Sequence, residues 1–243
     1  MTPDYNLKVF DNDEIFIKET AGFIIALADK TIKEKQRFVI SLSGGNTPNK
    51  LFALLATEEY SGKINWRRTF IFWGDERCVS LDDKLNNAHV AITLLLDKVP
   101  IPPLNVFPIP VNLPPAQAAI QYEQTIKSFF GNEEPAFDLI MLGLGENAHT
   151  ASLFPYTDVL KEKTRLVKEV YVEDQNMYRV TMTAPLINLA HNITFLVSGK
   201  SKAEVIKTIF NEPYQPEKYP AQLIKPTNGK LFWFLDKEAA ALI

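Results

Sequence analysis

The sequence is poor in several features that mark particular classes of protein. Cys78 is the one cysteine among 243 residues, so an internal disulfide is excluded and a reducing compartment is expected. No segment approaches the run of about 18 apolar residues that spans a membrane. The first residues, MTPDYNLKVFDNDE, contain no basic segment followed by an apolar one, as a signal peptide would. We therefore expect a soluble, cytoplasmic protein that makes no membrane contact.

A net positive charge is missing as well. The 26 lysines and arginines are outnumbered by 29 aspartates and glutamates, which gives a formal net charge of -3. A nucleic-acid partner would need a basic face, so none is expected. An anionic substrate would have to be held by a local cluster of donors instead of by the overall field.

Motifs for cofactors and metals are also missing. The glycine loop at 43–47 is not followed by Gly-Lys-Ser/Thr, as a Walker A loop would be, and it does not match GxGxxG. No spacing of His, Cys and carboxylate residues indicates a metal site, and the GxSxG of serine hydrolases is absent. We expect a protein that works with neither a metal nor a cofactor.

The chain does contain apolar segments that alternate between strand-like and helix-like periodicity. The apolar runs and alternating segments predict strands at 7–10, 38–42, 69–73, 138–142, 179–183, 193–197 and 230–236, with a possible edge strand at 106–107. Helical patterns cover 13–36, 48–55, 84–99, 115–130, 186–190, 201–210 and the tail 237–243, while 156–175 reads as irregular. Strands that alternate with helices predict an α/β fold, a doubly wound, mainly parallel sheet flanked by helices. We expect residues 1–243 to form one domain.

The stretch at 138–155, DLIMLGLGENAHTASLFP, carries the most informative histidine. A buried strand runs into a turn in which Gly143 and Gly145 let the backbone pass close to a ligand. Asn147, His149 and Thr150 follow within this loop. His149 is either a functional base or a turn residue whose ring is satisfied by hydrogen bonds, and the pattern alone leaves both open.

A second glycine loop follows the strand at 38–42. It consists of Ser43, Gly44, Gly45, Asn46 and Thr47, with Thr47 a natural N-cap and Pro48 a natural first helical residue. A glycine loop at a helix N-terminus aims backbone N–H groups and the positive end of the helix dipole at one point, which suits phosphate. The alternative is a Gly-Gly turn that serves chain geometry alone.

Charged residues lie at the ends of other predicted strands. Asp75 and Arg77 follow the strand at 69–73, Lys200 follows that at 193–197, and Arg179 begins the strand at 179–183. The carboxyl ends of parallel strands meet at one edge of the sheet, where such folds bind ligands. The cations and the glycine loop suit a phosphate monoester. His149 with Asp75 suits proton transfer, because a free imidazole has a pKa of about 6.5.

Six segments together resemble the 6-phosphogluconolactonase family over nearly the whole chain, and they occur in the family's order. They are SLSGGNTP, FWGDERCV, LGLGENAHTASLFP, YRVTMTAPLIN, FLVSGKSKAEVI and YPAQLIKPTNGKLFWFLD. The resemblance implies a fold of the glucosamine-6-phosphate deaminase and ribose-5-phosphate isomerase group. It also implies hydrolysis of 6-phospho-D-glucono-1,5-lactone to 6-phospho-D-gluconate in the oxidative pentose phosphate pathway. The partner would be this small sugar-phosphate lactone, bound by a monomer or a weak homo-oligomer.

The same resemblance implies residue roles. His149 would be the general base that activates water, and Asp75 would support it. The loop Ser43–Thr47, Arg179 and Lys200 match phosphate-holding positions, and Arg77 matches a substrate-site arginine. Gly145, Asn147 and Thr150 would support the histidine loop, whose N–H groups are candidates for binding the oxyanion.

The chain departs from the family pattern at three places. Asn147-Ala148-His149 replaces Asp-Gly-His, so a carboxylate that could stabilise the protonated ring is missing. Asn46 replaces a serine, and Asn86-Asn87 replaces a Ser-Asn pair. Two alternatives stay open: a sugar-phosphate deaminase or isomerase of the same fold, and a non-catalytic sugar-phosphate sensor.

Overall fold

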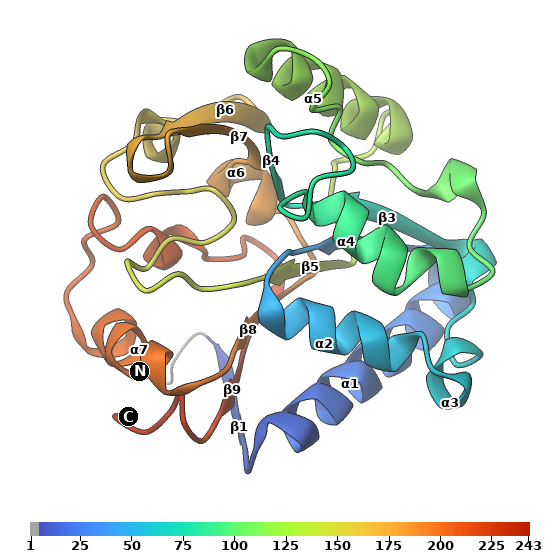
Figure 1. The fold of residues 1–243 in the computed structure, drawn as a ribbon, viewed down its shortest axis with the longest axis horizontal. Coiled ribbons are helices and arrows are strands. Elements are labelled where there is room, and N and C mark those ends of the chain that lie inside the picture. The colour runs from blue at the N-terminus through green and yellow to red at the C-terminus, as the bar shows by residue number, and fades with distance from the viewer. Residues whose placement is uncertain (1–4) are drawn as a thin grey trace.

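Six parallel strands form the main sheet of the protein (Figure 1). A computed structural model describes residues 5–243. The strand order is β1-β9-β8-β5-β2-β3. The strands are β1 (Asn6–Phe10), β2 (Phe38–Leu42), β3 (Thr69–Trp73), β5 (Leu139–Leu142), β8 (Asn192–Val197) and β9 (Lys230–Asp236). The chain moves from β2 outward to β3 and then returns to the other side of β2 as β5, which creates a topological switch point between β2 and β5. The predicted parallel α/β sheet is confirmed.

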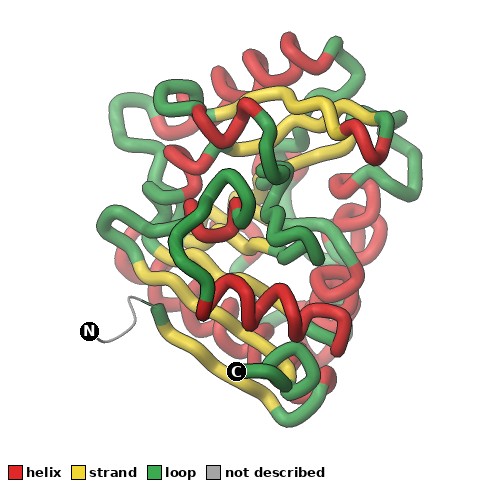
Figure 2. The backbone as a smooth tube through the Cα atoms, turned by 90° about the vertical axis from the view of Figure 1, so that its left-hand side faces the viewer, coloured by secondary structure: helices red, strands yellow, loops and turns green. Residues whose placement is uncertain are grey.

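A second sheet of three antiparallel strands was not expected from the sequence. Its order is β4-β7-β6, made by β4 (Asp75–Arg77), β7 (Met177–Met182) and β6 (Val167–Val172). Figure 2 shows its strands at the top of the molecule, apart from those of the main sheet. Gly74 joins the two sheets, because its N–H donates to Leu42 O and its carbonyl accepts from Met182 N at 2.7 Å. The acidic turn Asp75–Arg77 is therefore held as a strand.

Seven α-helices connect the strands in the described part of the chain. They are α1 (Asp13–Lys35), α2 (Asn46–Leu55), α3 (Glu58–Ser61), α4 (Asn87–Leu94), α5 (Pro115–Phe130), α6 (Ala184–Ile187) and α7 (Ala203–Asn211). Helix α1 begins where the side chain of Asn12 accepts from Ile15 N, and it ends at Gln36 in the left-handed conformation. Helices α1 and α2 pack together, and α5 packs against β6 and β7 (Figure 1).

Several predicted boundaries differ from the structure. Helix α2 begins at Asn46, two residues before Pro48. The tail at 237–243 forms turns and no helix. The strand expected at 106–107 is a single bridge between Val106 and Ile71.

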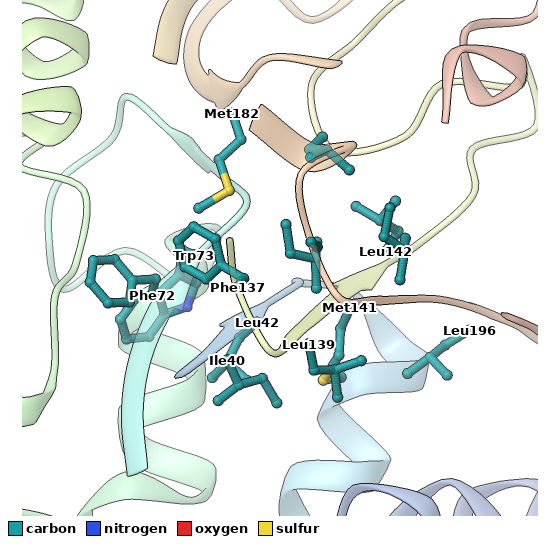
Figure 3. Packing of buried hydrophobic residues seen from close by; sticks show 14 of the residues in the cluster. Ile40, Leu42, Phe72, Trp73, Phe137, Leu139, Met141, Leu142, Met182 and Leu196 are labelled. Carbon is teal, nitrogen blue, oxygen red and sulfur yellow. The ribbon is translucent and has the colours of Figure 1, made fainter. Parts of the chain in front are cut away.

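The core is built on the central strands of the main sheet, which are buried along their whole length (Figure 3). Every residue of β2 and β5 is buried, so both faces of these strands are covered. Phe72, Trp73 and Phe137 are fully buried, and Phe72 packs edge-on against Phe137 with ring centroids 5.3 Å apart. With its faces covered, the sheet offers polar groups to a ligand at the strand ends. In residues 5–243, no helix has the length and apolar character needed to cross a membrane.

Candidate functional site

A cavity of about 640 Å³ opens at the carboxyl edge of the main sheet. Its walls are the segments that follow β2, β3, β5, β8 and β9, together with Arg179 of β7. The segments after β2 and β5 flank the switch point, which is where open parallel sheets bind their ligands. This one cavity is lined by residues that the sequence predicts at one edge of the sheet: the glycine loop, Asp75, Arg77, His149 and Arg179.

The hydrogen bonds of His149 define which ring nitrogen is free. Asn147 Oδ1 accepts the backbone N–H of His149 at 3.3 Å and lies 2.5 Å from its Nδ1. An atom that accepts a backbone N–H must be the amide oxygen, so Nδ1 carries the proton of the neutral ring. The lone pair is then on Nε2. The ring stacks on Phe154 with centroids 4.1 Å apart and planes 20° apart.

The backbone of the loop at 143–150, here the His149 loop, is closed on itself. Gly145 N donates to His149 O at 2.9 Å, and the Thr150 hydroxyl donates to Gly143 O at 2.9 Å. Ala148, the position of the family glycine, has a φ of 64°, and its N–H donates to Gly145 O. This left-handed conformation costs an alanine about 1–2 kcal/mol. The loop keeps the shape that glycine would adopt without strain.

These bonds limit which N–H groups of the loop are available to an oxyanion. The N–H groups of Gly145, Ala148 and His149 are already donated to acceptors within the loop. Three of the five N–H groups at 145–149 are therefore engaged before any oxyanion forms. Among the described residues, the N–H groups of Glu146 and Asn147 have no acceptor and stay candidates for that charge.

The electrostatic surroundings keep His149 neutral. Burial lowers the pKa of its imidazole from the ordinary 6.5 to about 4. The charge of Asp75 raises this pKa, whereas Arg179, Lys202 and Arg77 lower it further. The ring is thus unprotonated at neutral pH and can accept a proton from a ligand or from water.

Asp75 and Arg179 form a buried pair beside the histidine. Asp75 Oδ2 accepts from the Ser152 hydroxyl at 2.5 Å and lies 3.4 Å from Arg179 Nη1. Arg179 also donates to Gln175 Oε1 at 2.5 Å and lies over the Phe154 ring at 5.4 Å. Within residues 5–243 its buried Nε has no acceptor. A cation in the cavity wall, next to a neutral base, suits an anionic or polar ligand.

The loop Ser43–Thr47, here the anion loop, presents the start of α2 to the cavity. Gly45, with a φ of 116°, precedes the helix and has no side chain to cap it. Among residues 5–243, the N–H groups of Asn46 and Thr47 therefore have no intrahelical or side-chain partner, and both residues line the cavity. The Thr47 hydroxyl lies 2.9 Å from that of Ser198, which ties the anion loop to the end of β8.

Of the two lysines that follow β8, Lys202 lines the cavity and Lys200 does not. Gly199, with a φ of 94°, turns the chain after β8 into a short 3₁₀ helix at Lys200–Lys202. The N–H of Gly199 donates to the buried carboxylate of Asp236 at 2.9 Å. Lys200 is exposed and is not among the described residues that line the cavity, whereas Lys202 is. The sequence SGKSK contains both lysines, and the direction of the turn decides between them.

Other cavity residues were missed by the sequence reasoning. Asn87, at the first position of α4, and Ser198, at the end of β8, both line the cavity. Lys50 and Asp13 form a rim pair with 2.7 Å between Nζ and Oδ2. Asn87 could have been predicted from the sequence, since it occupies the second position of the family's Ser-Asn pair. No sequence pattern indicates the Asp13–Lys50 pair.

Comparisons with known proteins identify relatives in sequence and in fold. The family model described as glucosamine-6-phosphate isomerases/6-phosphogluconolactonase matches residues 11–233. A 6-phosphogluconolactonase from Synechocystis sp. is 40% identical, with 98% of each chain covered. The structure of 6-phosphogluconolactonase from Trypanosoma cruzi has a TM-score of 0.87 at 26% identity, covering 99% of this chain and 97% of that one. A monomeric glucosamine-6-phosphate deaminase shares the fold, with a TM-score of 0.80 at 23% identity and coverage of 98% and 100%. This chain belongs to the glucosamine-6-phosphate isomerase and 6-phosphogluconolactonase family.

Proposed function

We propose that the protein is a 6-phosphogluconolactonase, which hydrolyses 6-phospho-D-glucono-1,5-lactone to 6-phospho-D-gluconate. The observation that carries this proposal is the neutral imidazole of His149, with Nε2 free, in the wall of a cavity that also holds a helix N-terminus and several cations. The relatives that bear this name, 40% identical in one case, support the choice of substrate.

In the proposed mechanism His149 acts as the general base. Its Nε2 takes a proton from water while the water oxygen attacks the lactone carbonyl carbon. The tetrahedral intermediate then loses the bond between that carbon and the ring oxygen, and the imidazolium returns its proton to the departing oxygen. The charge of Asp75 favours the imidazolium that exists between these two steps.

The remaining roles follow from the donors that the cavity offers. The start of α2 and Lys202 would bind the phosphate, because both are positive and line the same cavity. Arg77 would contact the substrate beside them. We assign the developing oxyanion to Arg179, since it lines the cavity and packs with His149 on the same ring, that of Phe154.

A time-resolved assay of lactone loss tests the proposed function. The lactone opens spontaneously, so the rate with protein must clearly exceed that of the same buffer without it. Release of ammonia from glucosamine 6-phosphate would replace the proposal with a deaminase. Binding of 6-phosphogluconate with no turnover of either compound would identify a non-catalytic sensor.

Substitution of Asn147 by aspartate should move the pH profile. A carboxylate beside Nδ1 stabilises the imidazolium and raises the pKa of His149 from about 4 by about 1–3 units. Protonated His149 cannot act as a base, so the acid limb of kcat/KM should move to higher pH by the same amount. The stronger base should also raise kcat at neutral pH.

Profiles of wild type and Asn147→Asp are compared with the same substrate and buffers. The substrate phosphate titrates near pH 6 in both, so a difference between the two curves belongs to the protein. Coincident curves would mean that the neighbour at position 147 does not set the basicity of the ring.

The two lysines of the 3₁₀ helix provide a matched pair for the phosphate site. Lys202→Ala should raise KM for the phosphorylated lactone by about tenfold with a smaller change in kcat, because a charge contact to the phosphate is lost equally in ground and transition states. Lys200→Ala removes the same charge two residues away and should leave KM within about twofold of the wild type. The reverse order of effects would restore Lys200 to the site and remove Lys202.

A further inference from the structure

Glu76 is a buried carboxylate next to the cavity that the mechanism above does not use. It is 1% exposed and lies between Asp75 and Arg77 in β4. Its Oε1 accepts the N–H groups of Arg77 at 2.8 Å and Asn87 at 2.7 Å, and its Oε2 accepts that of Ala88 at 2.8 Å. A side chain from β4 therefore holds the first turn of α4.

Asn87, which this carboxylate holds, touches two parts of the cavity wall. Its amide nitrogen donates to Asp75 O at 3.0 Å, and its amide oxygen accepts from Arg77 Nη1. On its other side it packs against the anion loop: a Cβ on Gly44 would lie 1.8 Å from Asn87 Oδ1. Asn87 thus fills the space between the acidic turn and the anion loop.

From these contacts we infer that Glu76 is a positioning residue for catalysis. It fixes the backbone of Asn87, and Asn87 in turn holds the guanidinium of Arg77 and the anion loop at a set distance from each other. The inference rests on the proposed function for its catalytic part. Its structural part, the mechanical link from Glu76 to residues 43–47, stands without it.

The chemistry of the contact requires a carboxylate. Three N–H groups meet two acceptor oxygens at the positive end of a helix. Burial nevertheless raises the pKa of Glu76 to about 7, and the charge of Asp75 raises it as well. The bonds from the three N–H groups lower this pKa, so the donors favour the charged form that burial disfavours. Carboxylates with a pKa perturbed in this way, beside a ligand cavity, are common at functional sites.

The test compares Glu76→Gln with Glu123→Gln. Glu123 is also a buried glutamate, 7% exposed, and it accepts the backbone N–H groups of Leu166 and Val167. Neither of these partners lines the cavity, whereas Arg77 and Asn87, which Glu76 holds, both do. A glutamine at position 76 turns an NH₂ group toward an N–H donor, so Asn87 should shift. We expect kcat/KM to fall by about 10- to 100-fold, with a higher KM, in Glu76→Gln and to stay near the wild-type value in Glu123→Gln.

Hydrogen exchange gives a readout that needs no substrate. Glu76→Gln should speed amide exchange at residues 85–88 and also at 43–47, whereas Glu123→Gln should do so at 165–167 alone. Faster exchange confined to 85–88 would overturn the link to the anion loop. Unchanged kcat/KM in folded Glu76→Gln would overturn the catalytic role. A wild type without lactonase activity would refute the proposed function, and the exchange data would still decide the link.

Asn87→Ala replaces Glu76→Gln as the test variant if Glu76→Gln does not fold. It keeps the backbone hydrogen bonds to Glu76 and removes only the Asn87 side chain. It should reproduce the rise in KM. Gly44→Ala, whose new Cβ would collide with Asn87, should lower kcat/KM in the wild type and have a much smaller effect in Asn87→Ala. Equal effects in the two backgrounds would show that Asn87 does not transmit the contact.

Discussion

Replacing His149 by alanine should lower kcat/KM for lactone hydrolysis by about 10²–10⁴-fold, which is the usual contribution of a general base. The cavity, the anion loop and Arg179 would remain, so the substrate should still bind. KM should therefore change much less than kcat. The measurement is the initial rate of lactone loss at saturating substrate, with the rate in the same buffer without protein subtracted.

His191→Ala is the matched control for this experiment. His191 is exposed and lies at the opposite edge of the sheet, where its N–H donates to Phe137 O just before β5. Its removal should leave kcat unchanged. If kcat/KM of His149→Ala fell by less than tenfold, another group would have to activate the water. Asp75 would then be the next residue to test.

The part of the fold that could be predicted from sequence is the part in which burial covers both faces of a strand. The runs at 38–42, 69–73 and 193–197 are mostly apolar because nearly all of their side chains are buried, and they match β2, β3 and β8 closely. The three-stranded sheet could not be predicted because the sequence patterns of its strands are weak. β4 is three charged residues, and β6 has its charged Lys168 and Glu169 only half-buried. Its existence depends on pairing with β7, which no local pattern specifies.

The candidate site was also predictable only in part. Residues at strand ends, such as Asp75 and His149, could be placed together because parallel strands end at one edge. Lys202 could not be chosen over Lys200, because the choice depends on the φ of Gly199 and on the carboxylate of Asp236 that holds its N–H. The contacts of Glu76 could not be predicted, because two of its three backbone partners, Asn87 and Ala88, belong to a helix that begins eleven residues later.

Gly145→Ala should be nearly as damaging as removing the histidine itself. The φ of Gly145 lies outside the left-handed region, so an alanine meets no backbone penalty there. Its Cβ, however, would lie 2.0 Å from Nδ1 and 2.1 Å from Cε1 of His149. The ring has to leave its place between Asn147 and Phe154. We expect kcat/KM to fall by about 10²-fold and the free energy of unfolding by about 1–3 kcal/mol.

Two comparisons isolate the cause. Gly62→Ala, where a new Cβ would meet none of the described atoms within 4 Å, should leave activity unchanged. In a His149→Ala background the collision partner is gone, so Gly145→Ala should cost far less stability there than in the wild type, a coupling of about 0.5–3 kcal/mol. Additive losses of stability in the double variant would mean that Gly145 is needed for the backbone of the loop and not for the ring. In that case the position of the imidazole would depend on Asn147 and Phe154 alone.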